Sequence, residues 1–332
     1  MRTFQSAGEF YSVKMLNDSK LRKLLEQAID WRKEKSSGAL KGTQRLFSGA
    51  SDGVKGLWVD RYGDLIVINL YQKELHPKLE VLKSYFLNIS PNAEVLFKIK
   101  QEKGFKALTT YLDKDEFVCE EGECQYIIKT DIEHDFGLFL DTYVARDWLA
   151  KEAMAKSVLN LFSYTCAFGV VGMKHEASQV TNIDPSKEYL AWGKANAKLN
   201  RLDFRNLCDP AQKYLPRHIR RISEGKDERY DIVISDPPAF LVGRGDDRLG
   251  RKIWPKLLDW FQEMQPHQIV LICNDRSFRQ TRDMRSYFTE GLGGEYDLAE
   301  LHHGDDLLGQ NYDRLLSEND YLPPDIYIAT KN

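Results

Sequence analysis

With 332 residues, 42% of them hydrophobic and 29% charged, the chain has the length of two domains and the composition of a globular protein, which excludes a collagen, a coiled coil and a disulfide miniprotein. No apolar stretch is long enough to span a bilayer and no apolar run follows Arg2, so neither a membrane span nor a secretory signal is expected. The net charge of −3 does not by itself indicate a nucleic-acid binder, and the five cysteines, mostly scattered, favour a reducing, cytoplasmic setting.

The first 45 residues carry more positive charge than the rest of the chain. They contain ten Lys and Arg against five Asp and Glu, which gives +5 here and −8 for the remainder. Residues 15–35 are predicted to form one helix, with an apolar stripe that includes Leu21 and Leu25 and with Asp18 or Ser19 as its cap. Such a helix is either a solvated amphipathic helix or a surface that contacts phosphates.

The next part of the chain has a mixed pattern. Its predicted elements follow in this order: strands at 57–60 and 65–70, a helix at 76–87, and strands at 94–100, 106–111 and 117–129. We therefore predict a basic helical segment (1–45), a small α+β domain (46–130) that is a possible RNA contact, and a C-terminal domain (131–332).

From about residue 150 onward, strands and helices alternate. Strands are predicted at 158–162, 179–183, 230–235, 268–273, 296–302 and 325–329, and helices at 168–175, 186–200, 254–263 and 278–290. Such alternation predicts an α/β fold with a parallel, doubly wound sheet, whose ligands bind at the carboxyl ends of the strands.

The first two strand ends suit a nucleotide-type cofactor. The loop within 160–169 is poor in glycine, so it is a weak phosphate-loop signal by itself. Asp184 follows the next strand, about twenty positions on, where a carboxylate can accept hydrogen bonds from ribose hydroxyls. Because Pro185 and Ser186 precede a predicted helix, Asp184 can equally be a helix cap.

The next two strand ends suit a planar substrate. Asp236, Pro237 and Pro238 form a stiff loop whose proline carbonyls can accept from a base, and Phe240 can stack on the base. Cys273 stands at the end of the following strand, either as a reactive thiol or as a core cysteine. Cys119 and Cys124 lack further ligands at suitable spacing, so no metal site is predicted.

In this order, the four strand ends resemble the class I S-adenosylmethionine-dependent methyltransferases. They resemble more closely the bacterial large-subunit rRNA methyltransferases that make 5-methylcytosine or 7-methylguanosine, over about residues 20–330. The resemblance rests on Gly53-x-x-Gly56-Leu57-x-Val59-Asp60-Arg61-Tyr62-Gly63-Asp64, Gly137-Leu138-Phe139-Leu140-Asp141 with Arg146, Leu159-Asn160-Leu161-Phe162-Ser163-Tyr164-Thr165, Asp184-x-Ser186 and Asp236-Pro237-Pro238-x-Phe240.

The resemblance implies a Rossmann-like class I methyltransferase sheet preceded by a small α+β domain. S-adenosylmethionine is then the cofactor, S-adenosylhomocysteine the product, and RNA, in particular large-subunit rRNA, the partner; no membrane partner is expected, and a homodimer is compatible with it. About 45 residues precede the small domain, so the N-terminal PUA domain of many relatives is expected to be missing. Cys166 stands where relatives usually have glycine, and a negative φ there would still let the backbone approach the cofactor.

Carried over position by position, the resemblance assigns roles to individual residues. Phe162, Ser163, Tyr164 and Cys166 line the methionine moiety. Asp184, with the adjoining Pro185 and Ser186, holds the ribose, and Asp209 the adenine amino group. The cofactor is covered from the linker by Phe139, Leu140, Asp141 and Arg146. The target base is held by Asp236, Pro237, Pro238 and Phe240. Asp236 also lines the cofactor, and the resemblance assigns Asp236 and Cys273 to catalysis.

Two acceptor atoms remain open. Cytosine C5 needs a thiolate that adds to C6, and Cys273 is the expected nucleophile for it. Guanine N7 has a lone pair, so positioning suffices, and Asn274 with Arg276 and Phe278 resembles that group instead. An idle RNA-binding or ribosome-assembly protein that binds S-adenosylmethionine is a further alternative. A dehydrogenase is disfavoured by the glycine-poor first loop, and a small-molecule methyltransferase by the small domain, which it would not need.

Overall fold

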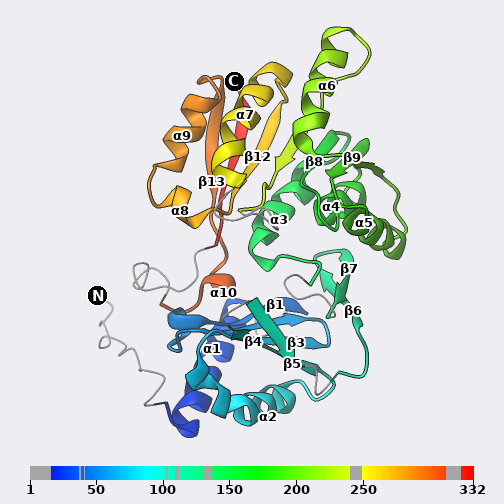
Figure 1. The fold of residues 1–332 in the computed structure, drawn as a ribbon. Coiled ribbons are helices and arrows are strands. Elements are labelled where there is room, and N and C mark those ends of the chain that lie inside the picture. Colours follow the sequence, from blue (N-terminus) through cyan, green and yellow to red (C-terminus); the bar gives the residue numbers. More distant parts are fainter. Residues whose placement is uncertain are drawn as a thin grey trace. The chain divides into compact units, whose positions relative to one another are not determined.

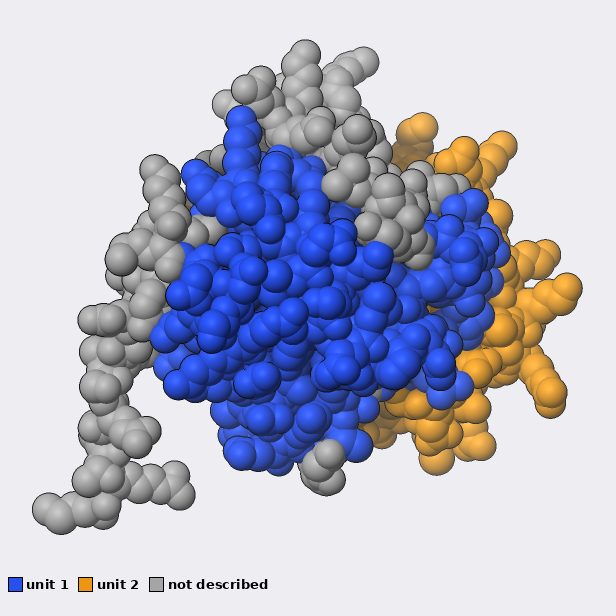
Figure 2. All heavy atoms as spheres, turned by 90° about the horizontal axis from the view of Figure 1, so that it is seen from below, with its two compact units in different colours: residues 1–121, 127–136, 303–322 blue, residues 122–126, 137–302, 323–332 orange. Residues whose placement is uncertain are grey.

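The computed structural model describes residues 16–36, 39–40, 42–101, 104–108, 112–130, 136–239, 249–311 and 323–332. The chain forms two compact units, each with its own sheet (Figure 1; Figure 2 colours them separately). Unit 1 comprises Met1–Glu121, Ile127–Phe136 and His303–Leu322, and unit 2 comprises Gly122–Tyr126, Gly137–His302 and Pro323–Asn332.

Unit 1 is built on a five-stranded sheet in the order β1-β2-β3-β4-β5. Its elements are α1 (Asp18–Lys35), β1 (Thr43–Ser48), β2 (Leu57–Tyr62), β3 (Leu65–Leu70), α2 (Leu79–Ile89), β4 (Glu94–Gln101), β5 (Gly104–Leu108) and α10 (Asp305–Leu308). β3 and β4 are parallel and the other neighbours antiparallel. Apolar side chains of α1 and α2, such as Leu21 and Phe86, share one core with the strands.

Helix α1 begins at Asp18, within the predicted range of 15–35, but its capping residue differs from the one expected. Asn17, rather than Asp18 or Ser19, is its N-cap, and its side chain accepts a hydrogen bond of 2.8 Å from the Lys20 amide. The apolar stripe is confirmed, since Leu21 and Leu25 are fully buried.

The Arg32 side chain is buried although it belongs to the basic N-terminal segment. Its Nη2 lies 2.8 Å from Asp52 Oδ2, and its Nε donates to the carbonyls of Arg45 and Asp306. This cation therefore holds α1, β1 and α10 together and is not available to phosphates. The division expected at residues 45 and 130 differs from the units observed, because these contacts join the N-terminal helix and residues of α10 to the small sheet.

A two-stranded hairpin, β6 (Glu116–Glu121) with β7 (Cys124–Lys129), forms a sheet of its own. Its tip is bound to unit 2 by Asn200, which donates to the Gln125 carbonyl at 2.7 Å and accepts from the Gln125 amide at 2.8 Å. These two bonds explain why Gly122–Tyr126 is grouped with unit 2.

Unit 2 contains a seven-stranded sheet in the order β10-β9-β8-β11-β12-β14-β13. The strands are β8 (Ser157–Leu161), β9 (Gln179–Asp184), β10 (Arg205–Cys208), β11 (Ile232–Ser235), β12 (Gln268–Cys273), β13 (Tyr296–Leu301) and β14 (Asp325–Lys331). The helices are α3 (Tyr143–Glu152), α4 (Ala167–Lys174), α5 (Lys187–Leu199), α6 (Ala211–Ser223), α7 (Leu249–Met264), α8 (Arg276–Arg279) and α9 (Met284–Gly291).

The predicted doubly wound α/β sheet is confirmed. β8, β9, β10, β11 and β12 pair in parallel, and side chains of α6, α7 and α9 share a core with one face of the sheet. The other face carries Asn160, Asn182 and Asn206, which hydrogen-bond in series across β8, β9 and β10 beneath α4 and α5. β14 is antiparallel to both of its neighbours, so the sheet is not wholly parallel as expected. Among the described residues, no helix combines the length and apolarity needed to cross a membrane.

Candidate active site

The loop after β8 turns sharply without glycine. Phe162, Tyr164 and Cys166 all have positive φ, of 56°, 48° and 61°. Each left-handed residue other than glycine costs about 1 kcal/mol or more, and such strain is concentrated at ligand sites. The loop is held in place from β9, because the Ser163 amide donates to the Ile183 carbonyl at 3.0 Å and the Tyr164 amide to Asp184 Oδ2 at 3.0 Å.

Cys166 adopts the conformation that favours glycine. A negative φ was the condition for a close approach of the backbone to the cofactor here, and it is not met, because Cys166 is left-handed, at φ 61° and ψ 32°, directly before α4. Its thiol is fully buried against Gly193 of α5, where an added Cβ would lie 2.8 Å from the Cys166 Cβ and closer still to Sγ. Burial raises the pKa of this thiol to about 12. The side chain therefore fills the interior below the loop.

Asp184 ends β9, and its carboxylate is fixed by two amides. Oδ2 accepts from Tyr164, and Oδ1 accepts from the Ser186 amide at 2.8 Å. Ser186, not Asp184, caps α5, because its hydroxyl accepts from the Tyr189 amide at 3.2 Å. Burial raises the pKa of Asp184, and the two amides oppose that shift. Each oxygen keeps a second lone pair for a ligand hydroxyl. The neighbouring Pro185 is exposed.

Asp209 follows β10 at the same edge of the sheet. Its amide donates to the Asp184 carbonyl at 3.1 Å, since Cys208 and Asp184 are partners in the parallel register. Its carboxylate forms an ion pair with Arg217 of α6. Sequence reasoning missed Arg217, because no motif links positions that meet only through the packing of a helix beside a strand end.

The linker before α3 carries three of the expected residues, and α3 itself carries the fourth, Arg146. Leu140 and Asp141 lie in a single 3-10 turn (Leu140–Thr142), with Leu140 buried. Arg146 is buried on α3 and donates to the Phe139 carbonyl at 2.8 Å and to Thr142 Oγ1 at 2.6 Å, so it fixes the linker from within. The Phe139 ring is 44% exposed and lies 5.4 Å from the Tyr164 ring.

Tyr164 is the centre of an aromatic group. Its ring centroid lies 4.5 Å from that of Tyr189 and 6.2 Å from that of Trp192, both on α5, in addition to Phe139. Sequence reasoning assigned Tyr164 and Phe139 but not the two residues of α5. Their signal is weak, because aromatic residues on a helix are usually core residues.

Asp236 lies at the carboxyl end of β11, beside the end of β12. Asn274 Nδ2 donates to its Oδ1 at 2.5 Å. Burial raises the pKa of Asp236 to about 7, with Asp141 acting in the same direction, while the Asn274 hydrogen bond and Arg146 oppose it. Both the protonated and the ionised form of this carboxyl group are therefore accessible near neutral pH. Of the rest of this loop, Pro237 is buried and Pro238 exposed, and Phe240 lies outside the described residues.

Cys273 ends β12, on the sheet face that carries Leu271 and Ser235. Its side chain is fully buried in the apolar core of unit 2. Burial raises the pKa of the thiol to about 12, although Arg279 opposes the shift. The resting side chain is therefore a protonated thiol. The described part of the chain holds no group of three or more His, Cys, Asp or Glu that could bind a metal ion.

The strand order, the antiparallel β14 and the acidic residues at the carboxyl ends of β9 (Asp184) and just after β10 (Asp209) define the Rossmann-like class I methyltransferase fold. Residues 113–275, just under half of the chain, match the family model of S-adenosylmethionine-dependent methyltransferases.

Named relatives agree with this placement. "Ribosomal RNA large subunit methyltransferase I" of Aeromonas salmonicida (strain A449) is 29% identical over 208 residues, which cover 60% of this chain and 52% of the relative. The protein of the same name from Escherichia coli O9:H4 (strain HS) is 27% identical over 231 residues, 66% of this chain and 57% of the relative. The chain thus spans about half the length of the curated relatives that it matches.

Solved structures share the fold over most of the chain. A putative S-adenosylmethionine-dependent methyltransferase from Streptococcus mutans is 25% identical, with a TM-score of 0.77 over 95% of this chain and 82% of that chain. A putative methyltransferase solved in complex with S-adenosylhomocysteine has a TM-score of 0.76 and 24% identity, over 95% of this chain and 82% of that chain.

Proposed function

We propose that the chain is an S-adenosylmethionine-dependent methyltransferase that modifies a base of RNA, and that large-subunit rRNA is its substrate. The observation that carries the proposal is the alignment of Asp184, Asp209 and Asp236 at the carboxyl ends of β9, β10 and β11. The names of the relatives, which refer to large-subunit ribosomal RNA, support the choice of substrate.

The residues present fit the cofactor. Asp184, already oriented by two amides, accepts hydrogen bonds from the ribose hydroxyls. Asp209 accepts a hydrogen bond from the adenine amino group while its carboxylate stays paired with Arg217. The methionine moiety is lined by the backbone of four loop residues, Phe162, Ser163, Tyr164 and Cys166. Pro185 and Ser186, at the start of α5, adjoin the ribose. The cofactor is covered by residues of the linker and α3, namely Phe139, Leu140, Asp141 and Arg146. When bound, S-adenosylmethionine supplies an electrophilic methyl group.

We propose cytosine C5 as the acceptor, with the base held by Asp236, Pro237, Pro238 and Phe240. The Cys273 thiolate adds to C6, and the electron pair displaced from the C5–C6 bond is delocalised toward N3. Asp236 suits this step because its raised pKa lets the carboxyl group donate a proton to N3. Once C5 carries the methyl group that the cofactor would supply, the N3 proton returns to the Asp236 carboxylate. Loss of H5 to water re-forms the C5–C6 double bond, and the C–S bond breaks with return of the electron pair to sulfur.

Guanine N7 is the second candidate, and the burial of Cys273 favours it. A thiol with a pKa of about 12 must lose its proton when the base binds, and this costs free energy that N7 chemistry does not require. N7 attacks the methyl group with its own lone pair, so the protein need only position it. Cys273 would then be a core residue.

One experiment tests the activity and distinguishes the acceptors. Purified protein is incubated with isotope-labelled S-adenosylmethionine and rRNA from cells that lack the gene, and the nucleosides are identified by mass spectrometry. We expect labelled 5-methylcytosine, loss of turnover by at least about a thousandfold in Cys273→Ala, and a covalent adduct between the unaltered protein and RNA that contains 5-fluorocytidine.

Other results reject parts of the proposal. Labelled 7-methylguanosine with full turnover in Cys273→Ala rejects the C5 mechanism and retains the enzyme. Cofactor binding without label on any rRNA leaves the idle binding protein as the remaining function. Cys273→Ser is the matched control, because it keeps the size of the side chain and removes the nucleophile.

A further inference from the structure

Helix α5 presents a row of cations on its exposed face. Lys187, Lys194 and Lys198 are seven and four residues apart, so they lie along one side of the helix, and Arg201 continues the row just after it ends. All four are exposed. The opposite side of α5 faces the interior through Leu190, Trp192, Gly193, Asn196 and Ala197. We refer to Lys187, Lys194, Lys198 and Arg201 as the α5 stripe.

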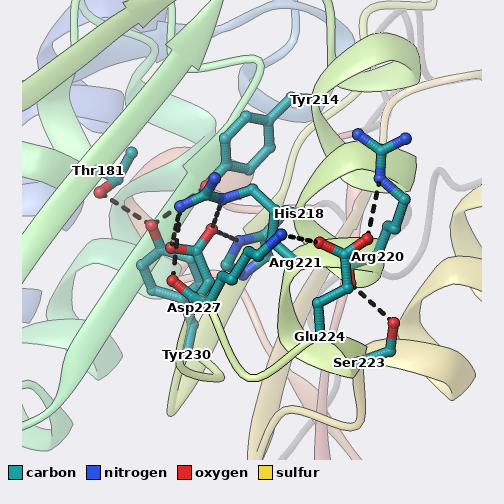
Figure 3. A network of polar contacts seen from close by, with 10 residues as sticks. Thr181, Tyr214, His218, Arg220, Arg221, Ser223, Glu224, Asp227 and Tyr230 are labelled. Carbon is teal, nitrogen blue, oxygen red and sulfur yellow. Dashed lines mark hydrogen bonds and ion pairs between the residues drawn. The ribbon is translucent and has the colours of Figure 1, made fainter.

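The α5 stripe lacks the acidic partners that other cations of unit 2 have. Among the residues that the structure describes, none of its four side chains forms an ion pair. Around the next helix the arrangement is the opposite, as Figure 3 shows. There Arg220 lies 3.8 Å from Glu224 and Arg221 2.6 Å from Asp227, and Lys226, just beyond the helix, lies 2.8 Å from Glu224.

Stabilisation of α5 does not explain why these four cations lie in one row. Lys194 and Lys198 are four residues apart and Lys198 and Arg201 three, spacings at which like charges destabilise a helix by about 0.2–0.5 kcal/mol per pair. The helix dipole favours Lys198 in the last turn but disfavours Lys187 in the first. Glu188 is the one carboxylate among the exposed positions of α5. A row that lowers local stability is best explained by an anionic partner.

We propose that the α5 stripe binds the phosphate backbone of the RNA substrate. This inference rests on the proposed function and adds the surface on which the RNA lies. The stripe starts three residues after Asp184, at the edge where the base and cofactor are placed, and Lys187 to Lys198 span about 16 Å along the helix. Lys and Arg side chains that neutralise phosphates supply most of the non-specific affinity for RNA.

The test compares two triple variants with the same loss of charge. In the stripe variant, Lys194, Lys198 and Arg201 are replaced by Gln. In the control variant, the paired cations Arg220, Arg221 and Lys226 are replaced by Gln. Binding of fluorescein-labelled oligouridine is measured by anisotropy over a range of KCl concentrations, together with S-adenosylmethionine affinity and circular dichroism as controls of folding.

The stripe variant is expected to reduce the slope of log K against log[KCl] by about 2, since each phosphate contact to single-stranded RNA contributes about 0.7. The control variant is expected to keep the slope of the unaltered protein. An equal loss in both variants, or no loss in the stripe variant, overturns the proposed surface while RNA binding by the unaltered protein stands. Failure of the unaltered protein to bind or methylate RNA rejects the proposed function itself and the surface with it.

Discussion

Cys166 and Gly193 occupy one space between the first loop and α5. The thiol enters the interior because its backbone is left-handed, and α5 can approach only because position 193 has no Cβ. The two residue types depend on each other, because a glycine at position 166 would leave room for a side chain at position 193. The pair explains how the loop keeps its turn without the usual glycine.

We expect Gly193→Ala to lower the free energy of unfolding by about 1–3 kcal/mol, the usual cost of overpacking, as measured by urea denaturation. In a Cys166→Gly background the same substitution should cost less by about 1 kcal/mol or more, because the thiol is gone and only the Thr165 carbonyl oxygen, 3.2 Å from the added Cβ, remains close. Equal costs in the two backgrounds would show that the two side chains do not compete for this space.

Asn274 lowers the pKa of Asp236 through a hydrogen bond, against the larger effect of burial. Its hydrogen bond stabilises the ionised carboxylate and so opposes the raised pKa of about 7, which Asp141 increases and Arg146 reduces. If the protonated acid is the active form, turnover falls as the pH rises through this pKa. Asn274→Ala removes the opposing bond, so the alkaline limb of the pH–kcat profile should move to higher pH.

The control for this profile is Asp236→Asn, which should lose the limb together with most of the turnover. An unshifted limb in Asn274→Ala would assign the titration to another group. A shift to lower pH would contradict the sign expected from removal of a hydrogen bond to the charged form.

At the scale of elements, one buried ion pair ties α1 to β1 and α10. Arg32 and Asp52 are both buried, and Asp52 also accepts from the amides of Ser48 at 2.6 Å and Gln310 at 3.1 Å. The loss of one partner would leave a buried charge without compensation. We therefore expect Arg32→Met to lower the free energy of unfolding of unit 1 by about 3–5 kcal/mol in urea.

Two comparisons make this expectation specific. Removal of both charges, in Arg32→Met with Asp52→Leu, should recover part of the loss, because no buried charge then remains unpaired. The exposed Arg22, also on α1, should tolerate Met within about 0.5 kcal/mol. A loss below about 1 kcal/mol for Arg32→Met would refute the role given to the pair.

The order of most elements of unit 2 was predictable, because buried strands appear in the sequence as short apolar runs and helices as apolar residues three or four positions apart. The direction of β14 was not, since an apolar run reads the same in parallel and antiparallel strands. β10 and α6 were not predicted, because β10 has only four residues, none of them fully buried, and α6 carries many charges.

The candidate site was predictable to the extent that it follows strand ends. Asp184 and Asp236 come directly after buried strands, so their placement at one edge follows from the parallel sheet. Arg217 escaped notice, and Asn274 was named without its contact to Asp236, because both contacts are determined by packing between distant segments. Cys273 stands at a strand end as expected, and only the structure gives the burial of its thiol.

At the scale of the whole molecule, positive charge is concentrated in particular parts of a chain whose net charge is slightly negative. The excess of cations in the first 45 residues is smaller than its count suggests, since Arg32 is used inside unit 1. The α5 stripe, in the more acidic remainder, is a second basic surface that overall net charge conceals. Net charge alone therefore gives poor guidance on RNA binding here.

The path of the chain through its units has a consequence for biosynthesis. Unit 1 includes α10, and β14 lies inside the sheet of unit 2, between β12 and β13. A ribosome delivers the N-terminal residues first, yet Arg32 cannot reach the Asp306 carbonyl until α10 has emerged, and the seven-stranded sheet cannot close until β14 has emerged. Neither unit is complete before these C-terminal segments have been synthesised, and a polypeptide released before β14 would leave the edges of β12 and β13 exposed to pairing with other chains.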